Sequence, residues 1–110
     1  MIKSIAVAYR KPGLSIEEFN HYWKDIHAPR AARIIPGVRK YVQNHLIPVP
    51  GRESEGDGVV EMWWDNLESF QKFMVWNKTE AGKELGEDAV KFMDMSKGRL
   101  WLVEEHEIKI

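Results

Sequence analysis

Two adjacent tryptophans, Trp63 and Trp64, constrain the fold of this chain more than any other feature of its sequence. They lie in an apolar stretch, VVEMWWD at residues 59–65, which is typical of a β-strand. Because successive side chains of a strand point to opposite faces of its sheet, one indole ring lies on each face. A second strand, expected at residues 2–9, is also apolar on both faces. We therefore expect a sheet that is covered on both sides.

The remaining segments predict helices that return over one face of this sheet. Further strands are expected at residues 38–47 and 99–108. Helices are expected to follow three positions that can cap a helix, which are Ser15, Asp65 or Asn66, and Thr79. The order β-α-β-β-α-α-β predicts an α+β fold with one four-stranded antiparallel sheet and helices on one face. We expect the bare face to meet the same face of a second copy in a homodimer.

Length, charge and composition narrow the functional classes. The chain has 110 residues, which fits a single domain over residues 1–110. Its net charge of −1 gives no reason to expect nucleic acid or an anionic membrane as a partner. No apolar run approaches the ~20 residues of a membrane span and no secretory leader is recognised, so we expect a cytoplasmic protein. Cysteine is absent and none of the four histidines is spaced i, i+4 from another, so we expect no metal and no cofactor.

The stretch EEFNHYWKDIHAPRAARIIPG, residues 17–37, contains the strongest candidate for chemistry. Apolar side chains at helical spacing form a stripe on it, namely Ile16, Phe19, Tyr22, Trp23 and Ile26. Because Pro29 cannot supply a helical N–H, the helix is expected to stop or bend near His27, with a helical tail at residues 30–35. His27 is then either a general acid/base facing a cavity or a packing residue at the helix end. In the first case, backbone carbonyls left without helical partners would fix the tautomer of its ring.

Tyr41 and Glu61 are the other candidate catalytic residues. Tyr41 either donates its hydroxyl proton to a substrate carbonyl or is an ordinary sheet aromatic. Glu61 shares a strand face with Trp63, so burial beside the indole would raise its pKa; otherwise it pairs with a cation across the sheet or dimer. Alternation places Tyr41 and His45 on one strand face and Asn44 on the other. The tryptophans are otherwise explained as core or interface, and Asn44 and His45 as solvated residues near a strand end. The candidate substrate-binding residues are Tyr22, Trp23, Asn44, His45, Trp63 and Trp64.

Two segments resemble the EthD family, named for a role in ethyl tert-butyl ether degradation. RKPGLSIEEFNHYWKDIHAP and IPGVRKYVQNH contain, in the family's order, the turn with its helix cap, the aromatic helix, the His-x-Pro and the Tyr-x-Gln-Asn-His strand. The resemblance implies a ferredoxin-like fold that dimerises through its sheets into an α+β barrel. It implies no single activity, because the family contains cofactor-independent enzymes acting on lactones or polyketides as well as members without an assigned reaction.

Three functional hypotheses follow from these features. The favoured one is a small cofactor-independent enzyme of lyase or isomerase type, which carries out isomerisation, cyclisation, dehydration or decarboxylation. Its substrate would be hydrophobic and carbonyl-bearing, such as an aromatic polyketide or a lactone, in a catabolic or secondary-metabolite pathway. The second is a non-catalytic dimeric barrel that binds a small hydrophobic ligand or assists a degradation pathway.

The third hypothesis is a cofactor-free or haem-dependent monooxygenase. No histidine lies between His45 and His106, where haem-degrading relatives carry their iron ligand, and this argues against the haem variant. The loop at residues 48–58 is either a lid over the site or a plain surface connection.

Overall fold

The computed structural model describes residues 1–110 and contains one four-stranded sheet in the order β2-β3-β1-β4. All three strand pairings are antiparallel. The elements are β1 (Ile2–Ala8), α1 (Ile16–His21), η1 (Tyr22–His27), α2 (Ala28–Ile34), β2 (Lys40–His45), β3 (Gly58–Trp64), α3 (Leu67–Trp76), α4 (Glu80–Val90) and β4 (Arg99–Val103). This confirms the predicted α+β fold class, a ferredoxin-like antiparallel sheet with helices on one face.

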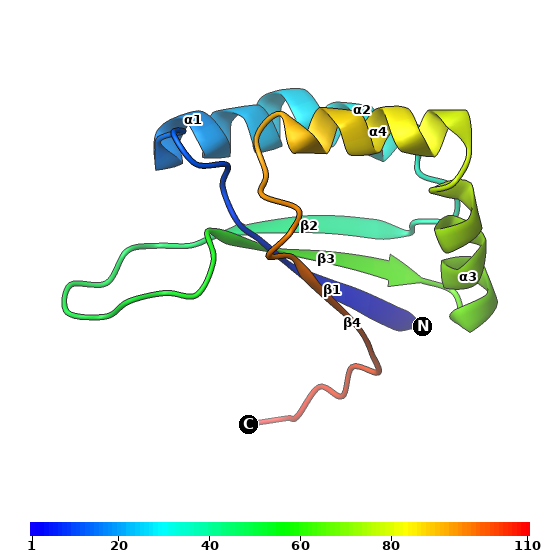
Figure 1. The fold of residues 1–110 in the computed structure, drawn as a ribbon. Helices are drawn as coiled ribbons and strands as arrows, with labels where there is room; N and C mark the ends of the chain where they lie inside the picture. The colour runs from blue at the N-terminus through cyan, green and yellow to red at the C-terminus, as the bar shows by residue number, and fades with distance from the viewer.

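The helices form a layer on one side of the sheet. The helices α1, α2 and α4 run above the strands, while α3 stands at the end of the sheet where β3 leads into it (Figure 1). The opposite side, which we call the open face, carries no helix, and the C-terminal segment after β4 extends on that side (Figure 1). None of the helices combines the length and the apolar character that crossing a lipid bilayer requires.

The two tryptophans of β3 lie on opposite faces, as alternation predicts. Trp64 is fully buried under α3, where it stacks on Phe73, and its indole N–H donates to Ser4 Oγ at 3.1 Å. Trp63 lies on the open face, where the amines of Lys3 and Lys40 approach its ring. One face of the sheet is therefore packed under helices, and the other presents an aromatic ring among charged side chains.

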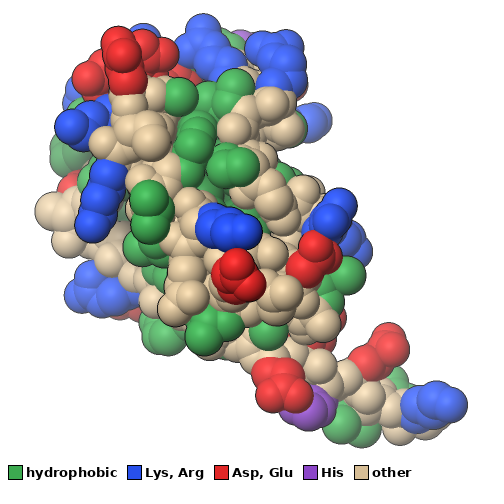
Figure 2. All heavy atoms as spheres, turned by 90° about the vertical axis from the view of Figure 1, so that its right-hand side faces the viewer, with side chains coloured by type: hydrophobic (Ala, Val, Ile, Leu, Met, Phe, Trp, Pro, Cys, Tyr) green, Lys and Arg blue, Asp and Glu red, His purple; other side chains and the backbone are tan.

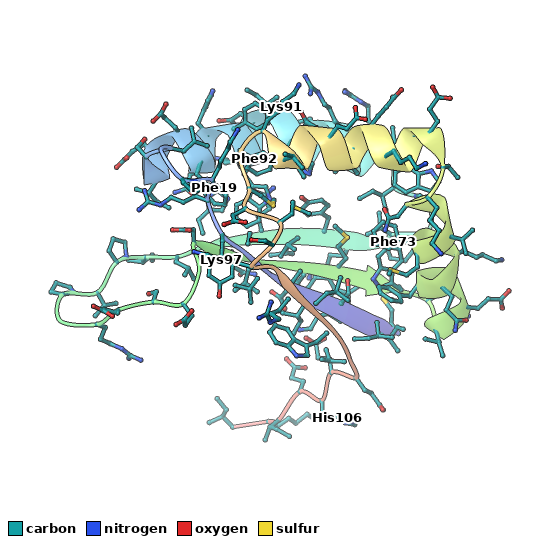
Figure 3. All side chains as sticks on the ribbon, in the orientation of Figure 1. Phe19, Phe73, Lys91, Phe92, Lys97 and His106 are labelled. Carbon is teal, nitrogen blue, oxygen red and sulfur yellow. The ribbon has the colours of Figure 1, made fainter.

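Two clusters of buried side chains fill the layer between helices and sheet. One connects the first helical segment to the end of α4 through Phe19, Trp23 and Phe92, and the other lies under α3 around Trp64. Phe19 and Phe92 point from the helices toward the sheet, and Phe73 reaches inward from α3 (Figure 3). The candidate site described below lies between these clusters.

The helix that carries His27 does not stop there, but its geometry changes at this place and the expected helical tail follows. Its middle part, η1, is a π-helix in which the Ala28 N–H bonds the Trp23 carbonyl five residues earlier. Pro29 then falls in the first turn of α2 and has no N–H to donate to the preceding turn. The wider π turn thus lets the chain stay helical through the proline, and His27 is buried in the layer below.

Two strands are shorter than predicted. β2 ends at His45, and the chain then forms the long loop that projects beyond the sheet before β3 (Figure 1). β4 ends at Val103, although the sequence predicted strand to residue 108. The residues that follow include three glutamates, and such charges at an edge strand favour solvent over further pairing.

Candidate functional site

A cavity of about 380 Å³ lies between the helix layer and the sheet. Its wall is mostly apolar, with Met62, Phe73 and Leu85 among the larger side chains, and its polar members are His27, Tyr41, Asn77 and Lys83. An apolar cavity with a few polar groups is the usual form of a small-molecule site. Seen from the α3 end, hydrophobic side chains gather between groups of charged ones (Figure 2). No residue of the loop at 48–58 borders this cavity, so no contact supports a lid.

A second hollow, of about 420 Å³, lies at the opposite end of the sheet. It is formed by the turn between β1 and α1 together with the loop before β3, and charged and polar side chains make up most of its lining. It contains no histidine and no buried carboxylate. The cavity between helices and sheet is therefore the better candidate for acid/base chemistry.

The His27 imidazole is buried and contacts Asp88 of α4. His27 Nδ1 lies 2.8 Å from Asp88 Oδ2. Because an ionised carboxylate can only accept, Nδ1 carries a proton and donates it. In the neutral ring Nε2 then holds the free lone pair, and this nitrogen has no hydrogen-bond partner within the chain. A carboxylate therefore fixes the tautomer, and not the freed backbone carbonyls that the sequence suggested.

Asp88 is held ionised in spite of its burial. The residue is only 5% exposed, and burial alone would raise its pKa. Hydrogen bonds from Tyr22 and His27, together with the Arg30 guanidinium at 2.7 Å, outweigh this effect and lower the pKa below its usual value. The contact with Asp88 also raises the pKa of the Tyr22 hydroxyl, because a phenolate there would face a carboxylate. Tyr22 and Arg30 therefore act on His27 through Asp88.

Tyr41 of β2 borders the same cavity as His27. Burial raises the pKa of its hydroxyl, which keeps the group protonated at neutral pH. The Tyr41 oxygen accepts a hydrogen bond from Gln43 Nε2 at 3.2 Å, and its own proton has no acceptor within the chain. The structure thus brings an imidazole with a free nitrogen and a hydroxyl with a free proton to one cavity.

Four of the candidate substrate-binding residues lie on the helix side of the sheet without bordering this cavity. Trp23 and Trp64 are fully buried in the core. His45 stacks on the Trp23 ring at a centroid distance of 4.8 Å, and burial lowers its pKa. Tyr22 reaches Asp88 through its hydroxyl. These residues pack behind the cavity and support the side chains that border it.

Glu61, Asn44 and Trp63 lie on the open face, separated from His27 by the sheet. The Glu61 carboxylate contacts Lys3 Nζ at 2.8 Å and accepts from Asn44 Nδ2 at 2.9 Å. The hydrogen bond from Lys3 is the largest cause that lowers the Glu61 pKa, followed by the one from Asn44. The expected rise in this pKa was wrong because a lysine on the neighbouring strand pairs with the carboxylate. The ion-pair explanation is the one that the structure shows.

Asp88 is the site residue that the sequence reasoning missed. A signal for it existed, because Asp88 occupies the apolar stripe of α4 between Leu85 and Ala89, with Phe92 one turn further on. A carboxylate within such a stripe is buried, and a buried carboxylate needs donors. The pattern predicts burial of Asp88, but it does not identify His27 as the partner.

The chain is similar to known proteins in family and in fold. The EthD domain model matches residues 11–96. An EthD family protein from Bacillus halodurans C-125 is 31% identical, with 96% of this chain and 100% of that chain covered and a TM-score of 0.71. No curated protein matches the chain.

Two more distant structures share the fold alone. SnoaB, a cofactor-independent oxygenase from Streptomyces nogalater, is 11% identical, with 97% and 94% of the two chains covered and a TM-score of 0.61. A dimeric protein of unknown function and ferredoxin-like fold from Bacteroides fragilis NCTC 9343 is 16% identical, with 94% and 95% covered and a TM-score of 0.62. The family match spans most of the chain and includes His27, Tyr41 and Asp88. The chain therefore belongs to the EthD domain family.

Proposed function

We propose that this chain is a cofactor-independent enzyme that moves a proton beside the carbonyl group of a hydrophobic substrate. The observation that carries the proposal is the buried His27–Asp88 pair at the wall of an apolar cavity. A carboxylate that holds one nitrogen of an imidazole leaves the other nitrogen free to take a proton. Membership of the EthD family agrees with such a role without specifying a reaction.

In the proposed reaction His27 is the general base. Its Nε2 takes a proton from the substrate carbon next to the carbonyl, and the electron pair of that bond forms an enolate. Asp88 stabilises the resulting imidazolium, and Tyr41 donates a hydrogen bond to the oxygen on which negative charge develops. Reprotonation, ring closure or loss of a leaving group from the enolate then gives an isomerase or lyase reaction.

The cavity favours a small hydrophobic substrate. Its volume of about 380 Å³ is at the lower end of the range for small-molecule sites, roughly 300–1,000 Å³. Methionine and phenylalanine side chains form much of its wall, which suits a flat carbonyl compound such as an aromatic polyketide or a lactone.

A cofactor-free oxygenase is the second candidate function, supported by the shared fold with SnoaB. The same proton abstraction would produce an electron-rich enolate, which could react with O₂ as a co-substrate. Oxygen consumption distinguishes this reaction from isomerisation or elimination.

The decisive experiment measures hydrogen exchange in D₂O. A panel of aryl ketones, β-keto lactones and cyclic diketones is incubated with the protein, and deuterium beside the carbonyl is followed by NMR. We expect His27→Ala to lower the exchange rate by roughly 10²–10⁴-fold, since a positioned base typically contributes that much. The control is His106→Ala, because His106 lies in the exposed C-terminal segment. Ligand binding without exchange would establish the non-catalytic alternative, and equal exchange in both variants would exclude His27 as the base.

We further propose that the chain forms a homodimer through its open face. Trp101 of β4 lies opposite Ile5 on this face and is 48% exposed, and Ile5 in turn lies opposite Glu61. An exposed indole beside apolar strand residues is typical of a protein interface. The dimeric ferredoxin-like protein from Bacteroides fragilis supports this arrangement by analogy of fold.

A further inference from the structure

Gln43 of β2 makes three hydrogen bonds that connect the π-helix, the cavity and His45. Its Nε2 donates to the Trp23 carbonyl at 3.0 Å and to the Tyr41 oxygen at 3.2 Å. Its Oε1 lies 2.9 Å from His45 Nε2. We infer that Gln43 is a positioning residue, which directs the Tyr41 hydroxyl proton into the cavity and is itself oriented by Trp23 and His45. This inference rests on the proposed function, in which Tyr41 donates to the substrate carbonyl.

The Trp23 carbonyl sets the direction of the whole network. A backbone carbonyl can only accept hydrogen bonds, so the group of Gln43 that faces it has to be the NH₂. The amide oxygen must then face His45. An amide oxygen only accepts, so His45 Nε2 has to carry a proton and donate it. The order of donation is therefore His45 to Gln43 and Gln43 to Tyr41.

The Tyr41 oxygen consequently receives hydrogen bonds and leaves its own proton free. Burial raises the pKa of Tyr41, while hydrogen bonds from Gln43 and from the Trp23 side chain act in the opposite direction. With the Gln43 donor directed at the oxygen, the O–H bond is left to point away from Gln43. Tyr41 borders the cavity, so the proton is available to a carbonyl oxygen bound there.

The two groups that orient Gln43, the His45 ring and the Trp23 carbonyl, are themselves held in place. The His45 ring stacks on the Trp23 indole with an interplanar angle of 20°. The Trp23 carbonyl also accepts the Ala28 N–H that defines the π turn, so its position is fixed by η1. His45 therefore helps to orient Tyr41 through Gln43, although His45 itself does not border the cavity.

The competing explanation is that Gln43 only ties η1 to β2 and has no influence on Tyr41. Two NMR measurements separate these roles and need no substrate. In ¹⁵N spectra of the whole protein, His45 is expected as the neutral tautomer with its proton on Nε2. With ¹³Cζ-labelled tyrosine, Gln43→Leu is expected to shift the Tyr41 titration to higher pH, because a donor to the phenolate is lost.

Activity supplies the third readout. Gln43→Glu keeps the shape of the side chain, but a carboxylate has no N–H to donate, so Tyr41 would turn its proton toward the new carboxylate. We expect kcat of the exchange reaction to fall by about three- to tenfold in Gln43→Glu and Gln43→Leu with KM nearly unchanged, the effect of one net hydrogen bond. The matched controls are Gln71→Glu and Gln71→Leu on the exposed surface of α3, which should behave as the unmodified chain.

The results distinguish failure of the Gln43 inference from failure of the proposed enzymatic function. A His45 proton on Nδ1, or a Tyr41 titration that Gln43→Leu leaves unchanged, would overturn the inference whether or not the chain is an enzyme. The expected NMR results in a protein that exchanges no substrate proton would support the orientation of Tyr41 and contradict the proposed function. If Gln43→Leu fails to fold, the tautomer of His45 in the unmodified chain and the isosteric Gln43→Glu still decide the question.

Discussion

Asp88 links the stability of the fold to pH. Its pKa in the folded chain lies below the ordinary value of 3.8. The stability that it contributes is therefore fully present above pH 3.8 and is lost as the pH falls through the lower folded value. We expect Asp88→Asn to flatten the acid limb of the stability curve, measured by urea unfolding between pH 7 and 2.

The control for this measurement is Glu87→Gln, which removes a neighbouring charge whose side chain is exposed. It should leave the acid limb as it is in the unmodified chain. An acid limb that is equally steep in Asp88→Asn would show that the Tyr22, His27 and Arg30 contacts do not stabilise the carboxylate.

Single residues also show where sequence reasoning succeeds and where it ends. Strand alternation was sufficient to place Tyr41 and His45 on one face and Asn44 on the other, because that rule is local. The alternation rule could not show that Glu61 has Lys3 beside it, because the sequence of one strand does not reveal which strand pairs with it. The pairing of His27 with Asp88 joins positions 61 residues apart, and no local pattern encodes it.

At the scale of elements, α4 offers a matched pair of glycines. A Cβ at Gly82 would clash with the Trp76 carbonyl and would lie 2.6 Å from the Asn77 Cα, whereas a Cβ at Gly86 meets nothing within 4 Å. Gly82→Ala is therefore expected to destabilise the fold by about 1–3 kcal/mol, as overpacking typically does. Gly86→Ala should stabilise it by about 0.5–1 kcal/mol through helix propensity.

Thermal and urea unfolding of the two variants test this difference. Equal destabilisation by both substitutions would mean that helix α4 does not lie as closely on the end of α3 as the structure shows. A stabilising Gly82→Ala would contradict the contact directly.

The first helix shows why element boundaries are harder to predict than element order. Proline rules place a helix end at Pro29, and they hold when the helix has 3.6 residues per turn throughout. The π turn of η1 changes that geometry, and nothing in the residue types of 22–27 distinguishes it from an ordinary helix. The Trp23 carbonyl accepts a hydrogen bond from Gln43 of the sheet as well as from Ala28, and this tertiary contact is not visible in the residue types of the helix.

The whole molecule leaves much apolar surface uncovered. Only 15 of 110 residues are buried, which is few for a chain that must be stable alone. Light scattering at micromolar concentration is expected to give about twice the chain mass of 12.9 kDa. A stable dimer would bury about 1,600 Å² in total. A mass of one chain for the unmodified protein would refute association through the open face.

Trp101→Glu tests which surface associates. It places a carboxylate on the open face and is expected to yield monomers, because a charge without a partner is costly in an interface. Val75→Glu makes the same change on α3 at the end of the sheet, where the side chain is 67% exposed. That variant should remain dimeric, and dissociation of both would point to a different interface.

The order of elements, the antiparallel sheet and the position of the helices were all predictable from the sequence. Each depends on apolar spacing within one segment and on turn residues between segments, such as the PG at residues 36–37. The end of β4 was predicted too far along the chain, because residues 104–107 are Glu-Glu-His-Glu and the pairing of β4 with β1 ends at Val103. Whether these residues pair depends on the neighbouring strand, and the residue pattern of one segment gives no information about that neighbour.

The distance along the chain between His27 and Asp88 also has a consequence for how this protein matures. Helices form within about a microsecond, whereas contacts between distant segments wait for the chain to close long loops. His27, Tyr22 and Arg30 are synthesised early, and each is about sixty residues ahead of the carboxylate that orients them. A nascent or partly refolded chain would therefore possess its helices before it possesses a working base. Recovery of activity after dilution from denaturant should lag behind recovery of the helical signal, so reactive substrates meet the base only in a chain that is already complete.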